Sequence, residues 1–473
     1  MEATAWGHKL REAQCAVVGL GISNLPLIDH LLSCGARVTA YDKKKRTELG
    51  GVADELEKKG VRLVLGEGYL DGLDGDVIFR SPGLRPDLPA FCAAVARGAV
   101  LTSEMELFLE LTPATVIGIT GSDGKTTTTT LTGKILEAAC RKRRYGRVYV
   151  GGNIGRPLLP HVGEMTKDDF CVVELSSFQL QTMTRSPVRA AVTNLSPNHL
   201  NWHTDMDEYV QAKTNIYCHA PNRHLVTNAE NEITRELAQA YGGQVTYFSS
   251  QRGLHELSAL MRTGDTAIYL ADGMITRFDG RCEQGLLRVE DILIPGMHNV
   301  ENYMTAIGLT APWMDADALF EIAKGFGGVE HRLERVRTVG GVTYYNSSID
   351  SSPSRTAAAL SALCQRPIVI CGGCDKGIPF GPLANTLCER AKAVVLTGAT
   401  ANAIKEALDA CERVQNGELP IYMEPQFEAA VRRARDVARD GDTVLLSPAC
   451  TSFDAFKNFE ERGETFKRIV RSF

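Results

Sequence analysis

The sequence predicts an α/β protein with three domains, each organised around a mostly parallel β-sheet. The chain has 473 residues, whereas a single hydrophobic core stops growing at roughly 250 to 300 residues. Short apolar runs alternate with amphipathic helical stretches, which is the order that parallel sheets require. Glycine-containing turns follow some of these apolar runs, and this is the edge of the sheet at which open α/β folds bind ligands.

Composition and charge argue against several classes of protein. The chain is 44% hydrophobic and 23% charged, as in ordinary globular proteins, and its formal charge of -5 offers no general attraction to nucleic acid or to an anionic membrane. Residues 1–10 lack the basic and then apolar pattern of a signal peptide, and no apolar run is long enough to cross a bilayer. We therefore expect a cytoplasmic protein that binds neither nucleic acid nor membrane. We also expect a monomer, although composition and charge do not bear on the oligomeric state.

The cysteines indicate a reducing compartment. There are 13 of them, an odd number spread along a long chain, which favours free thiols over a disulfide framework. Cys371 and Cys374 have the CxxC spacing of metal and redox sites. Because the apolar run 368–370 comes directly before them, we expect a buried strand that enters a glycine turn, and a metal or redox pair is the alternative.

The first glycine loop, residues 19–24, follows the apolar run 16–18. It resembles a dinucleotide-binding fingerprint, and Asp42 follows about twenty residues later, at the end of the next predicted strand. Asn24 stands where the third glycine belongs. The loop therefore predicts a Rossmann-like turn for a nucleotide diphosphate, and an NAD-dependent dehydrogenase is the alternative. Residues 81–83 (SPG) follow a later strand and should lie at the same edge.

A second loop, residues 118–127 (GITGSDGKTT), carries the strongest signal and follows another apolar strand. Its glycines allow backbone N–H groups to surround phosphate oxygens, the next helix begins with positive potential, Lys125 adds a charge, and Thr126 can ligate magnesium. Ile119 stands where the standard motif has its first glycine. We expect a phosphate-binding loop, and a tight turn with an incidental lysine is the alternative. Its predicted contacts are Gly121, Ser122, Asp123, Gly124, Lys125, Thr126 and Thr127.

Two breaks divide the alternating pattern. One lies at residues 112–113, and the other is the glycine cluster 325–328, which we interpret as a hinge. The predicted divisions are a Rossmann-like N-terminal domain at 1–108, a central P-loop ATPase-like domain at 109–327 and a C-terminal Rossmann-like α/β domain at 328–473.

Three further residues in the central domain are types found in metal sites. Glu174 ends a predicted strand, His199 follows another, and Lys213 lies on a predicted helix. Each alone is unremarkable, and a buried, hydrogen-bonded histidine is the alternative for His199. His203 follows at the spacing of zinc proteases, but no glutamate comes after His199, so that motif is excluded.

Taken together, the motifs resemble the Mur ligase family of peptidoglycan synthesis. The resemblance rests on the phosphate loop together with 151–155 (GGNIG), 174–179 (ELSSFQ) and 212–217 (AKTNIY). In the C-terminal domain, 446–454 (LSPACTSFD) and 456–463 (FKNFEERG) are similar to the members of the family that add D-glutamate. The resemblance therefore covers all three predicted domains.

The resemblance implies a two-step reaction on UDP-N-acetylmuramoyl-L-alanine. ATP would phosphorylate the terminal carboxylate of this substrate, and the amine of D-glutamate would then attack the acyl phosphate. A carboxylate is a poor electrophile until one oxygen becomes a phosphate leaving group. Positioning and charge neutralisation would therefore supply most of the catalysis.

The resemblance also implies roles for individual residues. Lys125 would hold the β and γ phosphates of ATP, Thr126 and Glu174 one magnesium ion, and His199 a second. In this family the lysine that matches Lys213 is carbamylated by carbon dioxide, which gives an anion able to help bind the metals. Further implied contacts are Asn299 with adenine and Arg332 with the ATP phosphates; Ser23, Asp42, Ser81, Pro82 and Gly83 with uridine diphosphate; Asn153, Ser176 and Gln179 with the muramoyl-alanyl part; and Ser351, Lys376, Ser452 and Phe459 with D-glutamate.

One loop departs from the family pattern. Residues 346–351 read Asn-Ser-Ser-Ile-Asp-Ser, where many members read Asn-Asp-Ser-Lys-Ala-Thr. An acidic residue and a lysine are lost, and we expect Asp350 and Arg355 to compensate through a different geometry. The alternatives are another Mur ligase, a folylpolyglutamate-type ligase, or a nucleotide-binding homologue without turnover. The C-terminal segments favour the D-glutamate-adding members.

Overall fold

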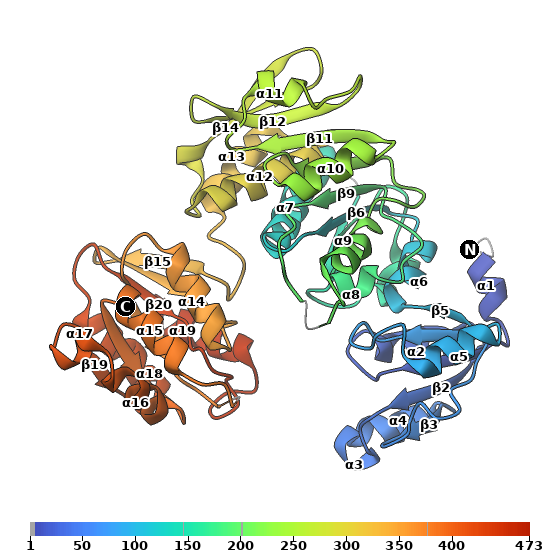
Figure 1. The fold of residues 1–473 in the computed structure, drawn as a ribbon, viewed down its shortest axis with the longest axis horizontal. Coiled ribbons are helices and arrows are strands. Elements are labelled where there is room, and N and C mark those ends of the chain that lie inside the picture. The colour runs from blue at the N-terminus through green and yellow to red at the C-terminus, as the bar shows by residue number, and fades with distance from the viewer. Residues whose placement is uncertain (1–4, 145, 200–201, 376) are drawn as a thin grey trace. The chain divides into compact units, whose positions relative to one another are not determined.

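The protein folds into three separate β-sheets with flanking helices (Figure 1). The computed structural model describes residues 5–144, 146–199, 202–375 and 377–473. The chain divides into two compact units, one formed by residues 1–291 and 297–323 and the other by residues 292–296 and 324–473. The predicted α/β fold with three sheet domains is confirmed. No helix in the described ranges has both the length and the apolar character that crossing a bilayer would require.

The N-terminal sheet is fully parallel, with strand order β3-β2-β1-β4-β5. Alternate residues of β1 enter two different hydrophobic clusters, so both faces of the sheet are covered. The strand order reverses at β1, and in open α/β folds ligands bind at the carboxyl ends of the strands beside such a reversal, here β1 and β4. The strands are β1 (Gln14–Val18), β2 (Arg37–Asp42), β3 (Arg62–Leu65), β4 (Val77–Arg80) and β5 (Val100–Thr102), and the helices are α1 (Ala5–Leu10), α2 (Asn24–Ser33), α3 (Arg46–Leu49), α4 (Gly51–Lys58) and α5 (Pro89–Ala96).

The central sheet has the order β14-β13-β12-β11-β10-β9-β6-β8-β7, with an antiparallel hairpin at β13 and β14. Side-chain caps start several of its helices: Ser103 caps α6, Asp205 caps α9 and Asn231 caps α10. The strands are β6 (Thr115–Thr120), β7 (Val148–Gly152), β8 (Phe170–Glu174), β9 (Arg189–Val192), β10 (His224–Asn228), β11 (Gln244–Ser249), β12 (Thr266–Ala271), β13 (Met274–Phe278) and β14 (Glu283–Arg288). The helices are α6 (Glu104–Leu111), α7 (Lys125–Arg143), η1 (Leu159–Glu164), α8 (Ser177–Leu180), α9 (Met206–Thr214), α10 (Glu232–Ala240), α11 (Leu254–Ser258), η2 (Val289–Asp291), α12 (Met297–Thr310) and α13 (Ala316–Gly325).

The C-terminal sheet has the order β15-β16-β20-β17-β18-β19, and among its described strands only β15 runs antiparallel to its neighbour. Residues Ile368–Cys371 of β17 alternate between two hydrophobic clusters, so this sheet is also covered on both faces. The strands are β15 (Glu334–Val339), β16 (Val342–Asn346), β17 (Ile368–Cys371), β18 (Ala393–Leu396), β19 (Ile421–Met423) and β20 (Thr443–Leu446), and the helices are α14 (Pro353–Ala362), α15 (Gly381–Arg390), α16 (Ala401–Asp409), α17 (Glu412–Gln415), α18 (Phe427–Val437) and α19 (Phe459–Arg471).

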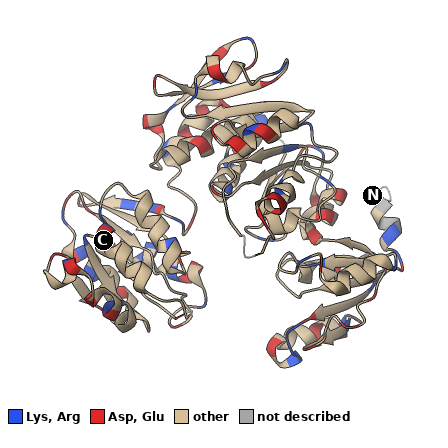
Figure 2. Ribbon diagram, viewed as in Figure 1, with Lys and Arg blue, Asp and Glu red and all other residues tan. Residues whose placement is uncertain are grey.

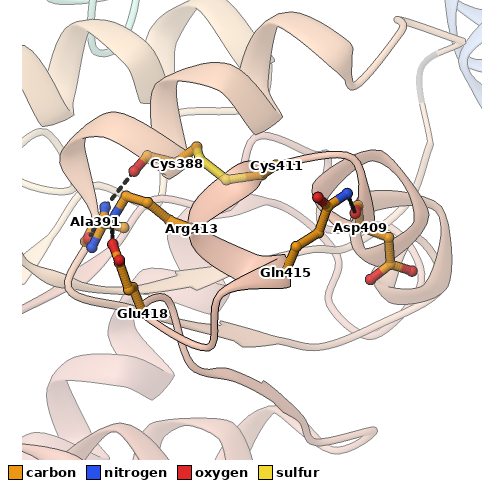
Figure 3. Close-up of a disulfide and its surroundings, with 7 residues drawn as sticks. All are labelled: Cys388, Ala391, Asp409, Cys411, Arg413, Gln415 and Glu418. Carbon is orange, nitrogen blue, oxygen red and sulfur yellow. Dashed lines mark hydrogen bonds and ion pairs between the residues drawn. A yellow bond between two sulfur atoms is a disulfide. The ribbon is translucent and has the colours of Figure 1, made fainter.

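The cysteines correct one expectation. Cys388 and Cys411 form a disulfide, with their Cα atoms 6.3 Å apart, which joins α15 to the N-cap of α17 (Figure 3). The expectation of free thiols throughout was wrong for this pair, because the fold brings the end of one helix to the start of another. The CxxC prediction is confirmed: Cys371 ends a buried strand, Gly372 and Gly373 follow with positive φ, and both of the CxxC cysteines are free.

Candidate active site

The phosphate loop joins β6 to α7, and at two of its glycines a Cβ would fit only if a neighbouring side chain moved. A Cβ on Gly121 would lie 1.9 Å from Thr193 Oγ1, and a Cβ on Gly124 would lie 2.4 Å from Asn302 Oδ1. Gly124 also has a φ of 77°, in the left-handed region, at the N-cap of α7. The loop therefore leads directly into the positive end of a helix of 19 residues, as a phosphate-binding site requires.

Lys125 is the first residue of α7, and its side chain extends back over the phosphate loop. Its Nζ donates to the carbonyl oxygens of Gly121 and Ser122, both at 2.9 Å. The ammonium group and the helix N-terminus thus share one small region. Together they make it electropositive, although the whole chain is acidic and its Lys and Arg side chains are interspersed with Asp and Glu (Figure 2).

Glu174 brings a buried carboxylate to the same edge of the sheet. It ends β8, pairs in register with Ile119 of β6, and is only 1% exposed. Its Oε2 accepts a hydrogen bond from Thr126 Oγ1 at 2.7 Å, and its Oε1 accepts one from Asn153 Nδ2 at 2.8 Å. A hydroxyl and a carboxylate therefore lie side by side next to the phosphate loop.

Lys213 approaches the loop from α9 and is fully buried. Its Nζ donates to Thr120 Oγ1 at 3.0 Å and to the carbonyl of Gly121 at 2.9 Å. Burial lowers the pKa of Lys213 well below its ordinary value, the charge of Lys125 lowers it further, and Glu174 opposes the change. The neutral amine is therefore easier to form at Lys213 than at an exposed lysine.

His199 has an exposed surface and an unusual backbone conformation, with a φ of 55°. Its ring packs edge-on against Phe178, with 4.9 Å between ring centroids. Partial burial lowers its pKa, and the charges of Lys125 and Lys213 lower it further. The alternative of a buried, hydrogen-bonded histidine was wrong for His199. It describes His203, which is buried and shares a hydrogen bond of 2.9 Å with Ser177 Oγ.

Asn299 belongs to α12, which packs against α7. Its Oδ1 accepts a hydrogen bond from Asn302 Nδ2 at 3.1 Å, and Asn302 Oδ1 accepts one from Thr128 Oγ1 of α7 at 3.2 Å. Asn302 was not among the residues predicted from the sequence. Its only sequence signal is its position three residues after Asn299, which places both side chains on one helix face.

Tyr209 is a second missed residue. Its hydroxyl lies 2.9 Å from Ser122 Oγ in the phosphate loop, and its ring lies 4.9 Å from Lys213 Nζ. The spacing of four residues between Tyr209 and Lys213 on α9 could have indicated this pairing, because such residues share a helix face. Ser122 is also fixed by the segment that follows β9, since its hydroxyl donates to the carbonyl of Ser196 at 3.0 Å.

In the N-terminal domain the two predicted loops touch. A Cβ on Gly19 would lie 2.8 Å from Ser81 Cβ, and the N–H of Ser81 donates to the carbonyl of Val18 at 2.9 Å. Asp42 accepts hydrogen bonds from the N–H of Leu20 at 2.6 Å and from that of Lys44 at 2.9 Å. Asp42 therefore shapes the glycine loop. Two further predicted residues lie at this edge: Ser23, at the N-cap of α2, and Gly83, in open space after Pro82.

Ser176 and Gln179 have a local structural role. The Ser176 hydroxyl accepts from the N–H of Gln179 at 3.3 Å, and Gln179 Oε1 accepts from the N–H of Ser176 at 3.0 Å. This capping box has its N-cap at Ser176, two residues after Glu174, and starts α8. It fixes the direction in which the chain leaves the site.

In the C-terminal unit, Ser452 is buried and Phe459 begins α19. An isolated bridge between Cys374 and Thr451 brings the glycine turn beside Ser452. Ser351 is half-buried at the end of the departing loop. Lys376 lies outside the described residues. Arg332 also belongs to this unit, and its backbone N–H donates to the carbonyl of Val329 at 3.0 Å.

The loop 346–351, whose sequence differs from the family pattern, is held firmly within this unit. Burial raises the pKa of Asp350 to about 6, and its Oδ2 accepts a hydrogen bond from Ser447 Oγ at 2.8 Å. Arg355 donates to the carbonyl of Ile349 at 3.2 Å, and the buried Arg462 donates to Ser348. Asp350 and Arg355 thus stabilise the loop itself.

One acidic cluster has the composition of a metal site. Glu330, His331 and Glu464 bring their ligand atoms within 4.8 Å of one another. However, Lys467 Nζ lies 2.5 Å from Glu330 and 2.6 Å from Glu464, with Glu334 at 3.2 Å. An ammonium group therefore already pairs with these carboxylates, and its positive charge opposes the binding of a metal ion beside it.

Comparison with known proteins identifies the family. Models of the Mur ligase MurD-like N-terminal domain, the Mur ligase middle domain and the Mur ligase glutamate ligase domain match residues 13–103, 119–310 and 331–450. The site geometry is that of a nucleotide-binding α/β enzyme, and the chain belongs to the Mur ligase family.

Close relatives match along nearly the whole chain. It is 48% identical over 465 residues to the UDP-N-acetylmuramoylalanine--D-glutamate ligase of Clostridium novyi (strain NT), covering 98% of this chain and 97% of that protein. Identity to the protein of the same name from Acetivibrio thermocellus is 46% over 468 residues, with the same coverage. A solved structure of MurF from Acinetobacter baumannii has the same fold, with a TM-score of 0.53, 16% identity, and coverage of 84% of this chain and 92% of that one.

Proposed function

We propose that the protein is an ATP-dependent amide ligase that joins D-glutamate to UDP-N-acetylmuramoyl-L-alanine during synthesis of peptidoglycan precursors. The observation that carries this proposal is the full-length similarity to enzymes named for this reaction. The phosphate loop, Glu174 and Lys213 support it, because they converge at one edge of the central sheet. We place the reaction in the cytoplasm, where ATP is available, and propose that a monomer performs it.

The chemistry follows from the charge of the reacting groups. Transfer of the γ-phosphoryl group of ATP to the alanyl carboxylate forms an acyl phosphate and releases ADP. The amine of D-glutamate then forms the amide bond and phosphate leaves. Negative charge accumulates on phosphoryl oxygens in the first step, so Lys125 and the N-terminus of α7 would stabilise it. Asn299 would contact adenine, and Arg332 the ATP phosphates.

The hydroxyl of Thr126 and the carboxylate of Glu174 suit magnesium. They are hard oxygen donors, they lie 2.7 Å apart, and they are next to the phosphate loop. Magnesium bound there would neutralise phosphate charge. For His199 we propose a second magnesium ion that orients the substrate carboxylate. Imidazole is not the donor that magnesium prefers, so this ion would keep mainly oxygen ligands from water and substrate.

The environment of Lys213 suits carbamylation. A neutral amine can attack carbon dioxide, so that a bond forms between Nζ and the carbon while one proton leaves the nitrogen. Burial and Lys125 both favour the neutral amine. The resulting anion would lie near Lys125 and help bind the metals. We expect a carbon-13 signal after incubation with labelled bicarbonate. Lys213→Met should abolish this signal, whereas Lys134→Met, an exposed change on α7, should leave it unchanged.

Each of the three domains would bind part of the substrates. We propose boundaries at 1–108, 109–327 and 328–473. The loops at 19–24 and 81–83 would hold uridine diphosphate together with Asp42. Asn153, Ser176 and Gln179 would contact the muramoyl-alanyl part. D-Glutamate would bind to Ser351, Lys376, Ser452 and Phe459.

An assay of ADP release tests the function directly. The purified full-length protein should release ADP only when ATP, UDP-N-acetylmuramoyl-L-alanine and D-glutamate are all present. A site that pins both carboxylates of the acceptor should prefer D-glutamate over L-glutamate by more than about a hundredfold. Efficient use of L-lysine, meso-diaminopimelate or L-glutamate would assign the chain to another ligase of the family. No turnover with any acceptor would indicate a nucleotide-binding homologue.

A further inference from the structure

We propose that Arg85 is a positioning residue for this reaction. It connects the loop that follows β4, where we place the uridine diphosphate, to the loop that carries His199. The inference rests on the proposed function and goes beyond it, because Arg85 belongs to none of the sites assigned above. The proposed role is to keep His199 in a fixed position relative to the bound UDP-linked substrate.

The guanidinium group of Arg85 makes contacts in two directions. Its Nε and Nη2 donate to both carboxylate oxygens of Asp87, each at 2.8 Å, which fixes the plane of the group. Its Nη1 donates to the carbonyl of Trp202, and its Nη2 donates to Glu208 Oε1 at 3.1 Å. A planar guanidinium can serve all of these acceptors at once, whereas the single ammonium of lysine cannot.

Glu208 also accepts hydrogen bonds from residues other than Arg85. Its Oε1 also accepts a hydrogen bond from Gln181 Nε2, at 2.7 Å, at the end of α8. Its Oε2 accepts from the N–H of Thr204 at 2.6 Å and from the Thr204 hydroxyl at 3.1 Å. One carboxylate thus joins Arg85, α8 and the segment that follows Trp202.

The ring of Phe178 carries the connection to His199. Its centroid lies 4.8 Å from that of Trp202 and 4.9 Å from that of His199. It also stacks on His203, whose ring is anchored to Ser177. The positive φ of His199 is a strained conformation for a non-glycine residue. It therefore persists only where the surroundings hold it.

A second arginine provides a contrast. Arg80 is fully buried and donates to the carbonyl of Phe178 at 3.0 Å and to Thr182 Oγ1 at 3.1 Å, so it secures α8 itself. Arg85 is 23% exposed and reaches Trp202 and Glu208 instead. We therefore expect removal of Arg85 to loosen the His199 loop while α8 remains in place.

The test compares wild type with Arg85→Met and Arg85→Lys in the full-length protein. Both changes should lower kcat by about 10- to 100-fold, the scale of a displaced reacting group. Both should also raise the magnesium concentration needed for half-maximal rate, while KM for ATP stays within about twofold of wild type. The control is Arg46→Met, since Arg46 also pairs with two carboxylates in the N-terminal domain, Asp54 and Glu57. It should leave all three values unchanged.

Hydrogen exchange tests the same contact without turnover. Amides of residues 202–208 should exchange at least about tenfold faster in Arg85→Met than in wild type, while those of α8 are unchanged. Wild-type kcat and magnesium dependence in Arg85→Met would overturn the inference. So would a lowered kcat with unchanged magnesium dependence and unchanged exchange, which would indicate loss of active protein only. If wild type fails to respond to D-glutamate, the proposed function fails, and the exchange experiment alone decides the role of Arg85.

Discussion

Replacing Glu104 by glutamine should stabilise the protein at pH 8 but not at pH 5. Glu104 begins α6 and is buried, and its Oε1 has no hydrogen-bond partner among the residues that the structure describes. Burial raises the pKa of Glu104 from 4.5 to about 7. A group with a raised folded-state pKa contributes its full stability below the unfolded value, and this contribution is lost as pH rises from 4.5 through 7. The shift corresponds to about 3 kcal/mol at pH 8.

The assay is urea unfolding at pH 5 and at pH 8. Between pH 5 and pH 8, the free energy of unfolding of wild type should fall by most of these roughly 3 kcal/mol. That of Glu104→Gln should fall much less. The matched control is Glu106→Gln, because the neighbouring Glu106 is equally buried but accepts two hydrogen bonds from Thr184, at 2.7 and 2.6 Å. That change should destabilise the protein at both pH values. A parallel pH dependence in wild type and Glu104→Gln would refute the reasoning.

Three further changes test the phosphate loop and the C-terminal unit. Lys125→Ala should abolish ATP-dependent turnover. The melting temperature should not change, because the Lys125 side chain interacts with loop carbonyls rather than with the core. If ADP release by the variant exceeded a few per cent of wild type, Lys125 would be excluded from the mechanism. Gly121→Ala should destabilise the protein by about 2 kcal/mol in urea unfolding, because its methyl group would overlap Thr193. Lys467→Met should lower the free energy of unfolding by about 2 kcal/mol, because three carboxylates would lose their shared cation. The control is Lys405→Met, which removes an exposed ion pair with Asp409. An equal loss of stability in the two variants would contradict the argument.

The sequence predicted the sheet edges well because a glycine turn after an apolar strand is a local signal. The loops at 19–24 and 121–124 both lie at the carboxyl ends of parallel strands, as expected. The contacts that complete these loops are long-range. Gly124 is restricted by Asn302, from a helix far along the chain, and no local pattern encodes that approach.

Side-chain roles were harder to predict for a related reason. Nothing in the segment around Lys213 indicates that the lysine is buried, so its role depended on resemblance alone. His199 and His203 both contact the ring of Phe178, but they differ because His203 is buried and bonds to Ser177, while His199 remains exposed. The disulfide between Cys388 and Cys411 depends on two helix ends that meet only in the folded domain.

The two lysines of the site are coupled, and this coupling gives a last prediction. Lys125 and Lys213 both donate to the carbonyl of Gly121 at 2.9 Å, and the charge of Lys125 is one of the causes that lower the pKa of Lys213. Lys125→Met removes that charge, so the pKa of Lys213 should rise towards its ordinary value, although burial still lowers it. Less neutral amine would then be present at a given pH, and carbamate formation should require a higher pH than in wild type. Carbon-13 labelling across pH 6 to 9 measures this shift, and Lys134→Met should not alter it. Identical labelling curves for Lys125→Met and wild type would show that the two lysines titrate independently.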